Sequence, residues 1–149
     1  MIAVTTAADI EWTSVATSCQ GDHVTASYIN YGDSPASSFA YVSTDGGATW
    51  TLPPMPSTLS YTGYRWQLVT MSDSGQFQYS SLDIVGEDKV TLFLGYDYGK
   101  NWTFLNNHDA PLNALVTGGS GKFTAAAAGD GIYLSADFGV TFTKQSTSV

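Results

Sequence analysis

Carboxylates are the most numerous ionisable groups in this sequence. A glycoside hydrolase needs two of them facing each other across the scissile bond. The carboxylates outside the repeated motif described below are Asp9, Glu11, Asp22, Asp33, Asp73, Asp83, Glu87, Asp88, Asp109 and Asp130. Asp22, Asp73 and Asp130 lie in or beside glycine-containing turns, where Asp is an ordinary turn residue. No pair stands out, and we therefore predict no catalytic residue.

One cysteine and two histidines could serve a nucleophilic or metal site. Cys19 precedes His23 by four residues, but a Cys-x3-His segment alone falls short of the usual four zinc ligands. A cysteine nucleophile also needs an adjacent base and an orienting partner, which this sequence does not guarantee. His108 lies far along the chain from His23. We predict no metal site and no cofactor, and a single cysteine excludes an intrachain disulfide.

The charge balance excludes several kinds of partner. Only 12% of the residues are charged and the formal net charge is −8. Phosphate binding requires clustered Lys and Arg, whereas the basic residues here are scattered, so we expect no nucleic-acid partner. No apolar run approaches the roughly 18 residues of a membrane span, and the N-terminal residues do not resemble a signal peptide. The Ser-, Thr-, Gly- and Tyr-rich composition suits an extracellular or virion-surface setting.

A repeated pattern dominates the sequence. Asp, any residue, Gly, any residue, Thr or Asn, an aromatic and Thr recur within 43–51, 95–103 and 135–143. Upstream of each copy lie three short runs of strand-forming residues, and no segment shows the apolar periodicity of a helix. Each unit is therefore predicted to be strand, turn, strand, loop, strand, Asp turn, strand. Four strands repeated roughly every 40–50 residues are typical of propeller blades.

The repeats predict a single all-β domain spanning 1–149. Blade 1 should cover about 12–54, blade 2 about 64–106 and blade 3 about 111–145. Trp12, Trp66 and Leu112 occupy the same position in the three repeats, so we expect Trp66 to lie in the core.

These motifs resemble the Asp-box (BNR-like) repeat of sialidase-like, sortilin-like and viral or secreted proteins. The resemblance implies β-propeller blades and a local, structural role for each box. The Asp should accept bonds from its own turn, the Gly should supply a positive φ, and the aromatic should pack into the blade. The residues concerned are Asp45, Gly47, Trp50, Asp97, Gly99, Trp102, Asp137, Gly139 and Phe142.

Sialidase activity is not expected from this resemblance. Sialidases bind the carboxylate of sialic acid with three arginines, a task for planar and permanently charged donors. This chain has one arginine, Arg65. We therefore predict that the protein is not an enzyme.

Three blades raise the question of closure, because propellers usually carry four to eight. Two copies could close a six-bladed ring by two-fold symmetry, and we expect such a homo-oligomer, with a dimer favoured. The alternative is a β-trefoil-like closed monomer, which also has twelve strands.

Ligand contact is predicted where aromatic and polar residues gather in long loops, as in sugar-binding sites. The candidates are Tyr31, Tyr61, Tyr64 and Arg65. The function predicted is a non-catalytic propeller module for glycan or protein-surface binding, as part of an attachment, fibre or secreted protein. Two alternatives stay open: a purely structural, self-assembling propeller unit, and a fragment derived from a glycoside hydrolase.

Overall fold

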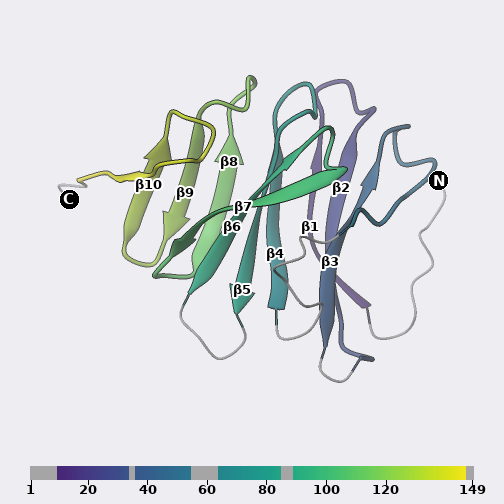
Figure 1. The fold of residues 1–149 in the computed structure, drawn as a ribbon, viewed down its shortest axis with the longest axis horizontal. Helices are drawn as coiled ribbons and strands as arrows, with labels where there is room; N and C mark the ends of the chain where they lie inside the picture. Colours follow the sequence, from purple (N-terminus) through teal and green to yellow (C-terminus); the bar gives the residue numbers. More distant parts are fainter. Residues whose placement is uncertain (1–9, 34–35, 55–63, 85–88, 147–149) are drawn as a thin grey trace.

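The computed structural model describes residues 10–33, 36–54, 64–84 and 89–146. These residues form strands and turns without a helix, in three antiparallel sheets. The sheets stand side by side like the blades of a fan, with the N-terminal blade at one end and the C-terminal blade at the other (Figure 1). The all-β propeller-like fold predicted from the repeats is confirmed. Among the described residues, none forms a helix long and apolar enough to cross a membrane.

Each blade is a meander in which consecutive strands pair. Blade 1 contains β1 (Ile10–Thr17), β2 (Val24–Asn30) and β3 (Ser37–Ser43). Blade 2 contains β4 (Tyr64–Met71), β5 (Gln78–Ile84), β6 (Val90–Tyr96) and β7 (Asn101–His108). Blade 3 contains β8 (Leu112–Thr117), β9 (Thr124–Ala128), β10 (Gly131–Ser135) and β11 (Thr143–Lys144). The first strand of every blade has a bulge or register shift against the second.

Blade 1 differs from the four-stranded prediction. Its fourth strand is reduced to an isolated bridge between Val42 and Thr51. Pro53 and Pro54 follow almost immediately. Because proline has no backbone N–H to donate to a ladder, the pairing stops after a single pair.

Two hydrophobic clusters fill the spaces between neighbouring blades. The cluster between blades 1 and 2 contains Phe39, Ala40, Trp66, Leu82, Phe93 and Trp102. The cluster between blades 2 and 3 contains Tyr79, Val90, Leu92, Leu112, Leu115 and Ala126. Trp66 is fully buried, with its ring centroid 4.9 Å from that of Phe39. Trp12, at the same position in blade 1, is 38% exposed, because no described blade precedes it.

Polar side chains are also buried between blades 1 and 2, where they bond to each other and to the backbone. The hydroxyl of Thr25 donates to the side-chain oxygen of Gln78 at 2.5 Å. The amide of Gln78 donates in turn to the carbonyl of Gly75 at 3.1 Å. Buried polar groups are tolerated when they are paired in this way. A Ser- and Thr-rich sequence can therefore still build the inside of a propeller.

The first Asp box is held by its own side chains. The carboxylate of Asp45 accepts bonds from the amide of Thr49 at 2.8 Å, the hydroxyl of Thr49 at 2.5 Å and the hydroxyl of Ser43 at 2.8 Å. Gly47 has a positive φ of 86°, which a side chain would disfavour. The indole N–H of Trp50 donates to the carbonyl of Gly47 at 3.0 Å, so the aromatic residue braces the turn.

The third box repeats this network, and the second one departs from it. Asp137 accepts bonds from Thr141 and from the hydroxyl of Ser135 with similar distances. The second box has Gly95 in place of the serine, and Asp97 itself adopts a positive φ of 53°. The remaining motif residues lie as follows: Gly99 and Gly139 have positive φ, Trp102 is buried, and Phe142 is half-buried against the second cluster.

The Asp45 network predicts sensitivity to acid. Bonds from the Thr49 hydroxyl, the Thr49 amide and Ser43 lower the pKa of Asp45 from 3.8 to about 2. A carboxylate with a depressed folded-state pKa stabilises the fold above its unfolded pKa and loses that effect as pH falls through the folded one. We therefore expect the Tm to fall between about pH 4 and pH 2, a decrease that we call the acid limb. Asp45→Asn should lower the Tm at neutral pH and make the acid limb less steep. Asp109→Asn, at an exposed side chain, is the control; equal acid limbs for wild type and Asp45→Asn would contradict the prediction.

The clusters between the blades predict where truncation is costly. Leu82 is fully buried, and Leu82→Ala should lower the free energy of unfolding by about 2–5 kcal/mol through lost burial and the cavity left behind. Leu52→Ala removes the same atoms from an exposed side chain and should change it by less than about 0.5 kcal/mol. Denaturant titration followed by tryptophan fluorescence measures both, and similar losses for the two variants would argue against this core.

Candidate binding surfaces

Neighbouring blades meet where a ring of one blade packs on a glycine of the next. His23, at the end of the first turn of blade 1, covers Gly75 of blade 2 so closely that a Cβ there would lie 2.7 Å from the Cβ of His23. Phe77 of blade 2 covers Gly121 of blade 3 in the same way, at 2.8 Å. A glycine is required at both places, because any side chain would push the blades apart. We call each such contact a joint.

Each joint is reinforced by a second ring and by the backbone. His23 stacks on Tyr98 with centroids 4.3 Å apart, and Phe77 packs on Phe138 at 5.1 Å. The amide of Cys19 donates to the carbonyl of Asp73 at 2.9 Å. The amide of Asp73 donates to the carbonyl of Gly119, also at 2.9 Å. Cys19, Asp73 and Gly119 occupy the same position in the three repeats, so the same bond recurs at both joints.

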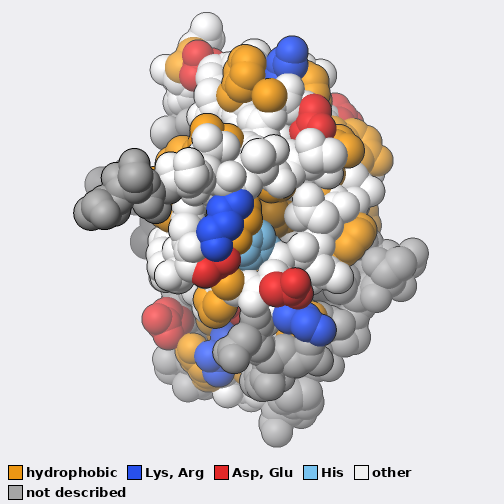
Figure 2. All heavy atoms as spheres, turned by 90° about the vertical axis from the view of Figure 1, so that its left-hand side faces the viewer, with side chains coloured by type: hydrophobic (Ala, Val, Ile, Leu, Met, Phe, Trp, Pro, Cys, Tyr) orange, Lys and Arg blue, Asp and Glu red, His pale blue; other side chains and the backbone are white. Residues whose placement is uncertain are grey.

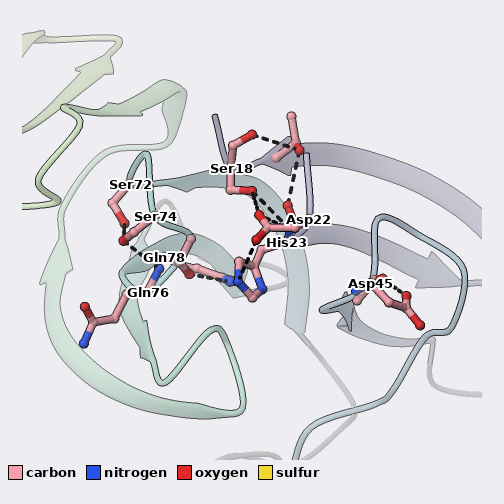
Figure 3. A network of polar contacts seen from close by, with 11 residues as sticks. Ser18, Asp22, His23, Asp45, Ser72, Ser74, Gln76 and Gln78 are labelled. Carbon is pink, nitrogen blue, oxygen red and sulfur yellow. Dashed lines mark hydrogen bonds and ion pairs between the residues drawn. The ribbon is translucent and has the colours of Figure 1, made fainter. Parts of the chain in front are cut away.

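The turn that carries each ring is ordered by a serine (Figure 3). The hydroxyl of Ser18 accepts a bond from the amide of His23, and it donates to the carboxylate of Asp22 at 2.5 Å. The hydroxyl of Ser72 accepts the amide of Phe77 in the same manner. Each ring is therefore held on a closed turn rather than on a free loop.

Blade 3 leaves its outer face open. Phe123 has the position that His23 and Phe77 have in the other repeats, but its side chain is 57% exposed. Val116 on β8 is 58% exposed, and Leu134 and Ile132 on β10 are exposed as well. Phe123, Val116 and Leu134 border a hollow of about 830 Å³ on this face, together with Thr117, Ala125 and Thr143. On this side of the molecule, hydrophobic side chains reach the surface, with charged side chains between them (Figure 2).

Among the described residues, blade 1 leaves part of its opposite face exposed. Trp12, Tyr28 and Tyr41 form an aromatic trio, with ring centroids 5.3–6.1 Å apart. Val15, beside the trio on β1, is 68% exposed, whereas its counterparts Val69 and Leu115 are each 7% exposed. Trp12 and Val15 therefore lie at the surface in blade 1, whereas Tyr28 and Tyr41 are half-buried.

The predicted ligand residues are not gathered into one described site. Tyr61 and the side chain of Tyr64 lie outside the described residues. Tyr31 is exposed in the turn after β2 of blade 1. Arg65 is exposed on β4 of blade 2, opposite Asp83 on β5.

Asp83 has the electrostatics of a general acid but lacks a described second carboxylate. Burial raises the pKa of Asp83, and a bond from Gln67 and the charge of Arg65 offset this only in part. A glycosidase acid needs such a raised pKa, but it also needs a second carboxylate across the bond. Within the described ranges, no group of three or more His, Cys, Asp or Glu residues could hold a metal ion.

A smaller cleft of about 430 Å³ lies at the joint between blades 1 and 2, lined in part by Cys19, His23 and Asp73. His23 is largely covered, its Nε2 lies 3.6 Å from the carboxylate of Asp22, and its Nδ1 is buried without a hydrogen-bond partner. Cys19 is exposed. Cys19 and His23 thus line one cleft, although the described part of the chain adds too few ligands for a metal.

Sequence reasoning missed the joint residues. The signal was present as a glycine followed two positions later by a ring: Gly21 and His23, Gly75 and Phe77, Gly121 and Phe123. In a single repeat this spacing is an ordinary turn. Only its recurrence at the same point of three repeats marks a contact between repeats.

Comparison with known proteins agrees with this architecture. The BNR/Asp-box repeat family matches residues 41–52, which contain the first box. A search of curated proteins finds no match. The GH74 xyloglucanase of Xanthomonas campestris superposes with a TM-score of 0.66 at 19% identity, over 92% of this chain and 22% of its own. The Niastella koreensis GH74 enzyme gives 0.58 at 18% identity, over 89% of this chain and 17% of its own.

A chain of a nidogen/laminin complex is similar as well, with a TM-score of 0.60 at 13% identity, over 89% of this chain and 47% of its own. This chain spans about a fifth of the two GH74 enzymes and about half of the third protein. Likeness at this level of identity shows the fold alone. Residues 41–52 thus match the Asp-box (BNR) repeat, and the chain as a whole has the fold of propeller blades.

Proposed function

We propose that this chain is a non-catalytic propeller module that binds a protein surface through the outer face of blade 3. The observation that carries the proposal is the exposure of Val116, Phe123 and Leu134 around one hollow. Isolated exposed apolar residues are common, but a contiguous group of them marks an interaction site. The centre of a protein interface is depleted of charged residues, and Val116, Phe123 and Leu134 offer uncharged, apolar side chains for such a centre.

A non-catalytic role is supported by the hydrogen bonds that several of the described carboxylates accept within their own blades. Asp45 and Asp137 are occupied by bonds from their own turns. Asp130 accepts bonds from Tyr133 and Lys144, both on its own blade. Asp83 is the one described Asp or Glu whose pKa is raised, and a lone acid does not make a glycosidase.

The glycan alternative depends on Tyr31, Tyr61, Tyr64 and Arg65 and stays a prediction. So does the setting in an attachment, fibre or secreted protein. Protein binding is favoured here because the exposed face is broad and mostly aliphatic, whereas sugars are held by aromatic faces with polar groups beside them.

Photo-cross-linking tests the binding face. A chain carrying p-benzoylphenylalanine in place of Val116 is expected to form protein adducts on irradiation in its producing cells. The matched control carries the same group at Asn107, an exposed position on β7 away from this face, and should form few. Mass spectrometry identifies the adducts. Equal yields at the two positions, or adducts with glycan alone, would contradict protein binding by blade 3.

An activity assay tests the non-catalytic half of the proposal. Purified chain is incubated with xyloglucan, the polysaccharide named by the xyloglucanase in the comparison, and reducing ends are measured. We expect no more release from wild type than from Asp83→Asn, which keeps the shape but removes the acid. Release by wild type that Asp83→Asn abolishes would show the chain to be an enzyme and would assign Asp83 to its site.

A further inference from the structure

We propose that the partner of blade 3 is a second copy of this chain, which docks its own blade 1 on that face in the register of the internal joints. This inference rests on the proposed function and names its partner. The two open faces are the two halves of an interface that the chain already forms twice. Blade 3 presents the half that blades 1 and 2 present to their successors. Blade 1 presents the half that blades 2 and 3 present to their predecessors.

The ring and the glycine of a third joint are both available. Phe123 holds the position of His23 and Phe77, the rings that cover Gly75 and Gly121. Gly21 is the corresponding glycine of blade 1, and nothing lies within 4 Å of the point where its Cβ would be. Phe123 of one copy would therefore cover Gly21 of the other without moving any described atom of its own chain's joints.

The aliphatic rows behind the ring match as well. Val116, Ala125 and Leu134 lie opposite one another across the outer face of blade 3. Leu134 corresponds to Val42, which is buried at the joint between blades 1 and 2. On the other side, the trio and Val15 correspond to the buried Trp66, Leu82, Phe93 and Val69. Docking would thus bury residues most of whose counterparts are already buried in the same arrangement, whereas Ala16 and Thr70, the counterparts of Val116, are half-buried.

The backbone hydrogen bond that recurs at the two joints could also form a third time, between two copies. The series runs from the amide of Cys19 to the carbonyl of Asp73, and from the amide of Asp73 to the carbonyl of Gly119. The next step would take the amide of Gly119 to the carbonyl of Cys19 in the second copy. This bond would fix the same offset between the copies as between the blades.

One contact would be weaker in the new joint. The second ring, Tyr98 or Phe138 in the internal joints, is replaced in blade 1 by Gly46. The contact between copies therefore lacks one ring–ring interaction, which is worth about 0.5–1.5 kcal/mol elsewhere. The second copy should consequently bind reversibly.

The blade count sets the number of copies. Such head-to-tail contacts either close a ring or grow into a filament. Propellers close with four to eight blades, and six is the only multiple of three in that range. Two sets of the three described blades would therefore close one ring with two identical contacts. Each copy carries a net charge of −8, so the association must be apolar and should survive added salt, which screens the repulsion.

Light scattering coupled to size exclusion across a dilution series tests this inference, in low and high salt. Wild type is expected at twice the 15.8 kDa of one chain. Val15→Glu spoils only the blade 1 face, and Val116→Glu spoils only the blade 3 face. Each variant alone should be monomeric. Val140→Glu introduces the same charge at an equally exposed valine in the third Asp turn, outside the joint, and should remain dimeric.

Mixing the two monomeric variants is the decisive step. One intact contact remains between Val15→Glu and Val116→Glu, so an equimolar mixture should form a heterodimer, with a Kd on the order of 100-fold or more above that of wild type because the second, intramolecular contact is lost. A heterodimer also shows that both variants are folded.

Three outcomes would overturn the inference. They are a wild type that stays monomeric at every concentration, a mass of three or more chains, and a Val15→Glu variant that still dimerises. The last would mean that two blade 3 faces meet each other. A monomeric wild type whose position 116 cross-links to a different protein would sink the second-copy assignment and leave the proposed function standing, whereas a dimer whose position 116 gives no protein adducts would contradict both.

Discussion

The contact between a ring and a bare glycine is the constraint on which the rest of this structure depends. A propeller blade is apolar on both faces, so each face must be covered by a neighbour, and the two blades can approach only where no Cβ separates them. His23 on Gly75 and Phe77 on Gly121 meet this requirement. The two clusters of the core then follow, because Trp66 and Leu82 on one side of blade 2 and Tyr79 and Leu92 on the other are brought against the adjoining sheets.

The packing of blades also separates carboxylates with a structural role from one that could take part in chemistry. Asp45 and Asp137 lie in the Asp-box turns. Their carboxylates accept hydrogen bonds from their own hairpins, so those oxygens have a structural role. Asp83 differs because it lies on a strand that is packed on both faces, and burial rather than hydrogen bonding dominates its pKa. Chemistry in a propeller thus depends on strand position more than on the presence of a motif, and the Asp box by itself indicates a fold and not an activity.

The repeats made the sheets predictable, because the box and the upstream glycine recur in register and strand periodicity fills the space between them. Trp66 could be placed in the core for the same reason. The predictions differed from the structure in one local feature and in the contacts between blades. The fourth strand of blade 1 ended at Pro53, whose missing N–H outweighed the pattern of the repeat. Trp12 and Phe123 are exposed because no described blade packs on them. The local sequence around each residue does not reveal this. Tyr31 and Arg65 were predicted from the composition of their segments, and composition does not say which side chains converge; Arg65, expected in a loop, lies on β4.

The two internal joints also have a consequence for how such a chain can vary. They have the same ring, glycine and backbone bond, although the segment joining blades 1 and 2 is long and the one joining blades 2 and 3 is only 109–111. The packing of one blade on the next therefore does not depend on the length of the segment that connects them. Circular permutation, with new termini cut between blades 1 and 2 and the old ones joined, would leave every joint residue in place, and the order of the blades along the gene would no longer be the order of the blades in space.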